Sequence, residues 1–304
     1  MRSVKMRKEM KKMMVLVVIM GLMAMSLSGC GQKAVTINLA AQNVNEVVIL
    51  ANMAKLLIEE NTDYETTLNT EFSGSSVLHQ AMESGEIDLY PTWTGTQLTG
   101  ILRYEGENMS KEDTYNYVKK GFEDEFGMTW SEPFGFNNTY VLVVKEEVAE
   151  EYGLENSSDL ATYAPEWTLA GDENFDTRND AYPGWSKAYG IDFKDVLPMQ
   201  YGLIYRAVDA GEVDVAVAYA TDSRIGALNL KILNDDKEFF PDYSGAYVLS
   251  EKIVNDYPEV IDILNQLGGA IDNEQMLALN YRFDNGEDPA TIAKEYLQEN
   301  GLIK

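Results

Sequence analysis

Gly85-Glu86-Ile87-Asp88-Leu89 and Gly211-Glu212-Val213-Asp214-Val215 are two copies of one short pattern, about 126 positions apart in a chain of 304 residues. Each copy follows a stretch with the spacing of an amphipathic helix, and an aromatic residue, Trp93 or Tyr219, stands eight positions after its glycine. A helix, a glycine turn, a buried strand and then a ring beyond the strand's end form an α/β unit that presents the ring at the ligand-facing edge of a sheet. The repeat predicts two lobes that share a cleft. The alternative is an ordinary turn into a buried strand.

Strands and helices are expected to alternate along most of the chain. Residues 35–40 and 140–144 have the composition of buried strands, whereas 45–60 and 111–126 have helical spacing of their apolar residues. This alternation predicts the α/β class, with a mostly parallel sheet flanked by helices in each lobe. From residue 251 onward we expect three or four helices that pack back onto the first lobe.

The domain organisation follows from this order of elements. Turn-forming residues at 134–138 and 241–245 separate hydrophobic segments and mark the two expected crossings between lobes. The predicted parts are a signal peptide at 1–29, a lipidated tether at 30–34, lobe I at 35–138 plus 245–304, and lobe II at 139–244.

The N-terminal residues have the pattern of an export signal. A basic segment is followed by an apolar run from Met13 to Met25 and by Leu27-Ser28-Gly29-Cys30, which resembles a bacterial lipobox. Thirteen apolar residues suit a signal peptide and are too few to span a bilayer. Cys30 is the only cysteine, so it suits a lipid anchor better than a nucleophile. We expect a protein anchored at Cys30 on the extracytoplasmic face of the plasma membrane; a coincidental cysteine after an ordinary signal is the alternative.

The charge balance limits the partners. The chain has 24 Lys and Arg against 50 Asp and Glu, and its net charge falls to about −31 once the first 29 residues are removed. Such a surface repels nucleic acid and anionic lipid headgroups, so no nucleic-acid partner is expected. A cationic ligand is compatible with this charge, although much of it is ordinary solvated surface. We expect a monomer.

The sequence lacks the usual patterns of an enzyme. His79 is the only histidine and falls inside an expected helix, and neither a Gly-x-Ser-x-Gly elbow nor a glycine-rich phosphate loop is present. We therefore expect a protein without catalysis, cofactor or metal. A secreted hydrolase that uses paired carboxylates stays open as an unfavoured alternative.

Aromatic residues instead fall where a ligand site is expected. Trp93, Tyr140, Tyr219 and Tyr243 each stand at a strand end or an expected crossing. A quaternary ammonium group has no N–H to donate, so a site must hold it with ring faces, each of which contributes roughly 0.5 to 2 kcal/mol. Taken singly, each ring is as well explained by packing, because the chain has 18 tyrosines.

Five motifs, in order, resemble those of substrate-binding proteins of ABC importers for quaternary-amine compatible solutes such as glycine betaine, choline and carnitine. The similarity covers nearly all of the chain after residue 34. The motifs are Ala41-Gln42-Asn43 with Glu46, Asp88 to Thr96 (DLYPTWTGT), Gly135 to Tyr140 (GFNNTY), Ala218 to Asp222 (AYATD), and Phe239 to Tyr243 (FFPDY).

The resemblance implies a two-lobed type II periplasmic-binding fold that closes on its ligand and delivers it to a permease. Its aromatic cage maps onto Trp93, Tyr140, Tyr219 and Tyr243. Positions that can approach the ligand or its carboxylate map onto Thr96, Arg178, Gln42, Ser75, Ser76 and Asn138. Another amine or an amino-acid-like solute in the same fold is the alternative ligand.

Two departures from the family bear on the ligand. Trp93 stands where most similar proteins have tyrosine, which preserves a cation–π cage but alters its width. Gln42 stands where the family has a lysine that can neutralise a carboxylate, which favours choline over glycine betaine. Arg178 would reverse that inference if it faces the cleft rather than bridging the lobes to an acid such as Asp222.

Overall fold

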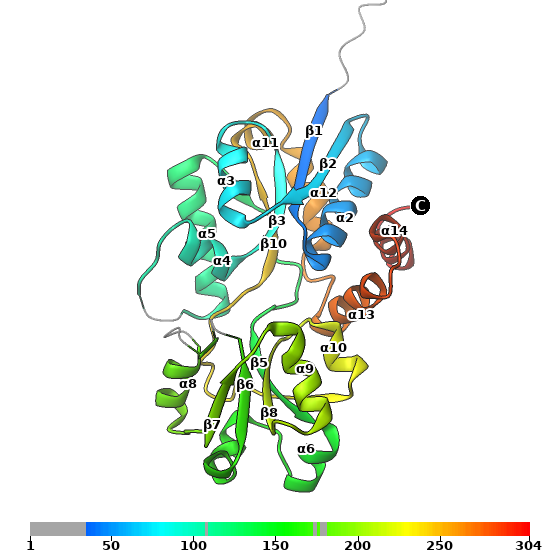
Figure 1. Cartoon of the computed structure of the whole chain (residues 1–304). Coiled ribbons are helices and arrows are strands. Elements are labelled where there is room, and N and C mark those ends of the chain that lie inside the picture. Colours follow the sequence, from blue (N-terminus) through cyan, green and yellow to red (C-terminus); the bar gives the residue numbers. More distant parts are fainter. Residues whose placement is uncertain (1–34, 107–108, 173–174, 177–180) are drawn as a thin grey trace, which may run out of the picture. The chain divides into compact units, whose positions relative to one another are not determined.

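The computed structural model describes residues 35–106, 109–172, 175–176 and 181–304. The described chain from residue 36 onward forms two five-stranded sheets with helices packed on them (Figure 1). The strand orders are β2-β1-β3-β10-β4 in the first sheet and β7-β6-β8-β5-β9 in the second. The predicted two-lobed α/β fold is therefore confirmed.

The first lobe is built around the first sheet. Its strands are β1 (Thr36–Gln42), β2 (Glu65–Phe72), β3 (Leu89–Trp93), β4 (Thr129–Trp130) and β10 (Gly245–Leu249). Its helices are α2 (Asn45–Asn61), α3 (Ser75–Glu83), α4 (Thr94–Gly100) and α5 (Lys111–Phe126).

The second lobe repeats this plan. Its strands are β5 (Tyr140–Lys145), β6 (Thr168–Gly171), β7 (Asp195–Pro198), β8 (Val215–Tyr219) and β9 (Leu230–Leu233). Its α-helices include α6 (Glu146–Tyr152), α8 (Tyr182–Tyr189), α9 (Tyr201–Ala210) and α10 (Ser223–Ala227), and two short 3-10 helices cover Ser157–Thr162 and Ala164–Glu166.

The chain ends in four α-helices, as expected: α11 (Glu251–Asp256), α12 (Glu259–Leu264), α13 (Asn273–Asp284) and α14 (Pro289–Glu299). A 3-10 turn, Asn265–Leu267, separates α12 from α13. Helices α12, α13 and α14 pack against α2, so this region returns to the first lobe. Helix α13 also packs against α10 and thereby contacts both lobes.

The chain passes between the sheets twice. Residues 131–139 lead from β4 to β5, and residues 234–244 lead from β9 back to β10. The two segments run together: the N–H of Asn138 donates to the carbonyl of Tyr243 at 3.1 Å, and Asn137 and Ser244 form an antiparallel bridge. The expected domain boundaries, 138/139 and 244/245, fall in these segments or at their ends.

The strand that follows each crossing is antiparallel to its neighbours. Strand β10 is antiparallel to β3 and β4, and strand β5 is antiparallel to β8 and β9. The other pairings are parallel: β1 pairs with β2 and β3, and β6 pairs with β7 and β8. The start of β5 therefore meets the end of β8, and the start of β10 meets the end of β3. This arrangement brings strand ends from distant parts of the sequence to the edge where the chain crosses.

The repeated glycines make the same turn in both lobes. Gly85 and Gly211 have φ angles of 76° and 70°, a left-handed conformation that glycine adopts without steric cost. The N–H of the next residue, Glu86 or Glu212, donates back to the preceding helix at 2.9 Å in each copy. The repeat is thus one structural unit that ends a helix and starts a central strand.

The aspartates of the repeat, Asp88 and Asp214, also make equivalent hydrogen bonds in the two lobes. The carboxylate of Asp88 accepts a hydrogen bond from the backbone N–H of Asn38 at 2.8 Å, and that of Asp214 accepts one from the N–H of Thr168 at 2.8 Å. Each aspartate joins its central strand to the start of the neighbouring parallel strand. An acid at this position is therefore explained by the sheet and not by a ligand.

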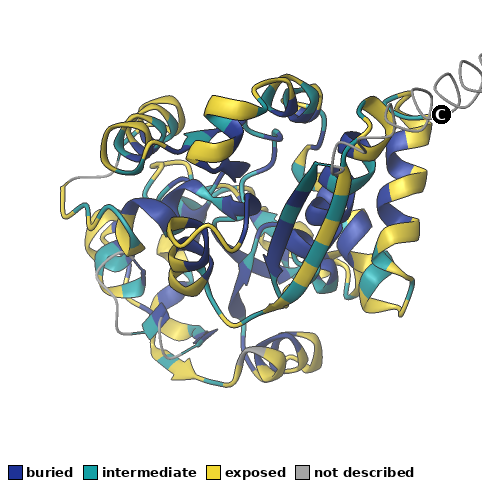
Figure 2. Ribbon diagram, turned by 90° about the horizontal axis from the view of Figure 1, so that it is seen from above, coloured by how far each residue is buried: buried dark blue, intermediate teal, exposed yellow. Residues whose placement is uncertain are grey.

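Each sheet has its own apolar core. The core of the second lobe gathers β5, β6 and β8 with Trp185, Tyr205 and Phe175, and the core of the first includes Tyr90 and Trp130. Figure 2 shows buried central strands and helices whose outward faces are exposed, whereas the edge strand β2 alternates between exposed and half-buried residues. Within the described ranges, no helix combines the length and the apolar character that a membrane span requires.

Several local expectations need correction. Trp93 is the last residue of β3 rather than a residue beyond its end, because antiparallel pairing with β10 extends the strand to Trp93. Ser75 and Ser76, which the resemblance placed near the ligand, start helix α3. The short strands β4, β7 and β9 were not anticipated, because two to four residues carry too little periodicity for a prediction.

Candidate functional site

A cavity of about 1070 Å³ opens among the crossing segments, the ends of the central strands and the C-terminal region. Both lobes contribute to its wall, as do α2 and α13. The residues that line it include Asn45, Glu46, Trp93, Thr96, Asn138, Tyr140, Tyr219, Thr221, Asp222, Ser223, Arg224, Tyr243, Asn280, Tyr281 and Asp284. The four rings expected from the sequence are all among them.

Two of the rings come from the second lobe as a cross-strand pair. Tyr140 starts β5 and Tyr219 ends β8, and the antiparallel register places them opposite each other. Their rings are stacked, with centroids 5.1 Å apart and an angle of 25° between planes. Phe175 and Phe240 pack against Tyr140 from behind. These ring contacts fix the orientation of the pair at the cavity wall.

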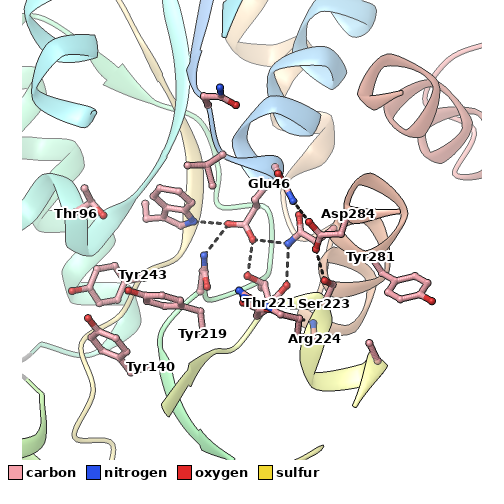
Figure 3. A pocket seen from close by; sticks show the side chains of 18 of the residues that line it. Glu46, Thr96, Tyr140, Tyr219, Thr221, Ser223, Arg224, Tyr243, Tyr281 and Asp284 are labelled. Atoms are coloured by element: carbon pink, nitrogen blue, oxygen red, sulfur yellow. Dashed lines mark hydrogen bonds and ion pairs between the residues drawn. The ribbon is translucent and has the colours of Figure 1, made fainter. Parts of the chain in front are cut away.

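The other two rings lie on the first-lobe side. Trp93 ends β3 and pairs with Gly245, and Tyr243 stands two residues before that glycine in the returning segment. Tyr243 packs closely over Gly95, where an added Cβ would lie 2.8 Å from its ring. Thr96 is in the same helix, α4, and lines the cavity beside these rings (Figure 3). The missing side chain at Gly95 leaves room for Tyr243.

A buried carboxylate, Glu46, joins the elements around the cavity. It accepts hydrogen bonds from Trp93 Nε1 at 2.6 Å, Thr221 Oγ1 at 2.7 Å, Asn138 Nδ2 at 3.3 Å and Asn280 Nδ2 at 3.3 Å. These donors come from β3, the segment after β8, the first crossing segment and α13. Figure 3 shows Glu46 at the centre of this network. One side chain therefore connects both lobes and the C-terminal helices.

The environment of Glu46 affects its protonation in two opposing ways. The residue is only 2% exposed, and its burial raises the pKa of the carboxyl group above the ordinary 4.5. The hydrogen bonds from Thr221, Trp93, Asn280 and Asn138 stabilise the ionised form and oppose that shift. The position in the first turn of α2 also favours a negative charge, because the helix N-terminus carries partial positive charge.

A second group of polar side chains lies next to the Glu46 network (Figure 3). Asp284 accepts hydrogen bonds from Asn45 of α2 and from Ser223 of α10, so it too connects the first and second lobes (Figure 3). Asp222 accepts two hydrogen bonds from the guanidinium of Arg224. The described lining residues include three carboxylates, those of Glu46, Asp222 and Asp284, and one guanidinium, that of Arg224. The described wall therefore has net negative charge.

Other expected site residues lie elsewhere or cannot be placed. Gln42 ends β1 and donates to Ser75 Oγ at 2.7 Å, but neither of them, nor Ser76, lines the cavity. Arg178 and Cys30 lie outside the described residues, so their roles stay predictions.

Sequence reasoning placed Glu46 and Thr221 in two of the family motifs but assigned no site role to Glu46, Thr221, Asn280 or Asp284. Glu46 did carry a signal: it directly precedes the apolar run Val47 to Ala51, all of which is buried in α2. A carboxylate next to such a run, on a helix that leaves no solvent-facing side there, needs partners. Asn280 and Asp284 carry no comparable signal, because only the tertiary fold brings α13 to the site.

The fold and the cavity define a two-lobed protein with a cavity between its lobes, walled by aromatic rings and carboxylates. Residues 35–299 match the family model described as the substrate binding domain of the ABC-type glycine betaine transport system. The chain belongs to this family of transport proteins, as its motifs had indicated.

The chain is similar to several known proteins over most of its length. It is 40% identical over 285 residues to the carnitine transport binding protein OpuCC of Listeria monocytogenes, covering 92% of each chain. It is 32% identical over 267 residues to the ergothioneine transport permease/ergothioneine binding protein EgtU of Helicobacter pylori, covering 86% of this chain and 47% of that protein. A solved structure titled glycine betaine/carnitine/choline ABC transporter aligns with a TM-score of 0.84 and 36% identity, covering 88% of this chain and 100% of that chain.

Proposed function

We propose that this protein captures a quaternary ammonium solute in an aromatic cage formed by Trp93, Tyr140, Tyr219 and Tyr243. The observation that carries the proposal is that four rings from four separate segments line one cavity whose described wall has net negative charge. Ring faces attract a cation through their quadrupole and also match the apolar methyl groups of a trimethylammonium head. The relatives named for carnitine and ergothioneine support the same ligand class.

Binding would proceed without chemistry. The methylated head loses its water among the rings, and contacts from both lobes favour the closed arrangement by differential affinity. Stacking of Tyr140 against Tyr219 restricts the rotamers of both rings, which limits the ordering cost of binding. We infer that a permease then recognises the closed form; the relative whose name joins a permease and a binding protein supports this partnership.

The ligand's other end decides among choline, glycine betaine and carnitine. The guanidinium of Arg224 already forms two hydrogen bonds with Asp222, so its charge is largely balanced. Gln42 is engaged with Ser75 outside the cavity wall. Both observations favour a ligand that is a cation over one that also carries a carboxylate. Thr96 and Asn138 line the cavity and are two of the polar side chains there that could contact a ligand hydroxyl.

Titration calorimetry of the purified protein with choline, glycine betaine and carnitine tests the proposal. Micromolar binding of at least one of the three supports the proposal, and the order of the three affinities indicates whether a cation or a zwitterion is preferred. Preference for the two zwitterions would point to Arg178 as a carboxylate partner. Absence of heat and of any thermal stabilisation with all three would overturn the quaternary-amine assignment while leaving the fold unaffected.

We further infer that the chain is exported and lipidated at Cys30, and acts as a monomer at the extracytoplasmic face of the membrane. The support is the sequence alone: a basic segment, an apolar run and Leu27-Ser28-Gly29-Cys30. Metabolic labelling with a palmitate analogue in a bacterial host tests it. Incorporation that the Cys30→Ala variant abolishes is expected, and an unlabelled membrane-free wild type would contradict the anchor.

A further inference from the structure

We propose that Glu46 is the specificity-determining residue for positive charge: its carboxylate supplies the countercharge of the bound cation. This inference rests on the proposed function, since it assigns to Glu46 the discrimination between a quaternary ammonium group and a neutral group of the same shape. The four rings alone do not fully distinguish a cation from a neutral group of the same shape, because an aromatic pocket also accepts a neutral trimethylated head by apolar burial.

The hydrogen bonds around Glu46 match an ionised carboxylate. All four of its partners are positioned as donors, from an indole N–H, a hydroxyl and two side-chain amides. A protonated acid would have to donate to one of them; the indole N–H of Trp93 cannot accept, so the bond with Thr221 or with one of the amides would have to be reversed. A carboxylate has enough lone pairs for all four bonds, which suits the arrangement found.

The charge of Glu46 has no cationic partner in the described part of the chain. Its four hydrogen-bond partners are all neutral groups, and no ion pair with Glu46 is formed there. A buried carboxylate without a countercharge is costly, even when it is hydrogen-bonded. A cation that enters the adjoining cavity removes part of that cost, and a neutral ligand does not.

Trp93 connects this charge to the cage. The same indole that lines the cavity donates its N–H to Glu46 at 2.6 Å. An N–H that donates to a carboxylate is polarised, which raises electron density on the ring and strengthens its attraction for a cation. Glu46 therefore acts on the ligand both directly through its charge and through the ring of Trp93.

Two further atoms add to the negative potential. Asn138 Oδ1 and Asn280 Oδ1 are buried and have no hydrogen-bond partner in the described structure, and both residues line the cavity. Each amide turns its nitrogen toward Glu46. Rotating either amide would place an oxygen against the carboxylate, so Glu46 fixes these two unpaired acceptors in place. The partial negative charges of these two oxygens attract a nearby cation more strongly than a neutral methyl cluster.

The test compares choline with dimethylbutanol, in which carbon replaces the ammonium nitrogen. Both affinities are measured on the full-length protein, that of dimethylbutanol by displacement of choline, for the wild type, Glu46→Gln and Glu46→Asp. Asp214→Asn is the matched control, because it removes a carboxylate that bonds the backbone of Thr168 in the second sheet. Thermal melts establish that each variant is folded.

We expect E46Q to lower the ratio of choline to dimethylbutanol affinity about tenfold or more, because it removes the charge at nearly constant size. E46D keeps the charge and should stay within about threefold of the wild-type ratio even if both affinities fall. A merely structural role predicts that E46Q and E46D weaken both ligands in parallel with an unchanged ratio, which would overturn the inference. Failure of the wild type to bind choline, glycine betaine or carnitine would instead contradict the proposed function itself.

Discussion

The indole N–H of Trp93 donates a hydrogen bond to Glu46 at 2.6 Å, so one ring of the proposed cage is fixed by a buried carboxylate from a different element. Trp93 ends β3 and Glu46 lies in the first turn of α2. A tyrosine at this position would offer an O–H at a different distance and angle. The tryptophan and the carboxylate are therefore best understood as a matched pair.

Substitution of Trp93 separates the ring from its N–H. Trp93→Ala should lower affinity for the quaternary ammonium ligand roughly tenfold or more, the loss expected for one desolvated ring. Trp93→Phe keeps a ring face but cannot bond Glu46, so we expect an intermediate loss of about threefold. Calorimetry with a thermal melt for each variant checks this. Unchanged affinity in folded W93A would remove Trp93 from the site.

Gly95→Ala should disturb the cage through Tyr243. The added Cβ would lie 2.6 Å from the carbonyl oxygen of Asp242 and 2.8 Å from the Tyr243 ring. Relieving the first contact would require a shift of the backbone at Asp242. Overpacking of this kind costs about 1 to 3 kcal/mol, and a displaced ring should lower affinity about tenfold. Gly202→Ala is the control, because its Cβ would meet nothing within 4 Å in α9. Equal affinities of G95A and G202A would contradict a role for Tyr243.

The affinity for choline should depend on pH through Glu46. Burial raises the pKa of Glu46 above 4.5 in the free protein, and a bound cation would lower it by favouring the charged form. The free protein then binds a proton more readily than the complex, so affinity falls as pH falls through the raised pKa and levels off above it. The hydrogen-bond partners of Glu46 do not titrate in this range.

Calorimetry at a series of pH values checks this dependence, with E46Q as the control for the other cavity acids. Any contribution from Asp222 or Asp284 persists in E46Q, whereas that of Glu46 disappears. A pH profile that is the same in the wild type and in E46Q would show that Glu46 does not titrate with binding.

The aspartates of the repeat should affect stability and not binding. Asp88 bonds the N–H of Asn38 and pairs with Lys252 at 3.0 Å, and its side chain is only 2% exposed, so Asp88→Ala should lower the free energy of unfolding by about 3 kcal/mol. Asp214→Ala removes one hydrogen bond to Thr168 and should cost about 1.5 kcal/mol. Chemical denaturation measures both. A loss of ligand affinity in folded D88A would mean that the acid has a role beyond the sheet.

Much of the fold could be predicted from local patterns. The helix at 111–126 has the predicted bounds, and α2 and β5 each differ by one residue at one end, because long amphipathic or continuous apolar segments carry strong periodicity. The repeat at Gly85 and Gly211 correctly indicated two equivalent units, since a left-handed turn and an acid that bonds the next strand are local requirements. Strands β4, β7 and β9 were not predicted, because they are strands through pairing with their neighbours and not through a pattern in their own sequence.

The candidate site divides in the same way. The sequence by itself determined which rings stand at strand ends and that carboxylates outnumber cations, because these are properties of short segments and of composition. Only the tertiary structure decided that Tyr140 meets Tyr219 across antiparallel strands and that Glu46 lies among donors from four elements. Such contacts depend on register and on the packing of α13, which link residues as far apart as Glu46 and Asn280. The energetics of a buried charge is set by these distant neighbours, so no local pattern can report it.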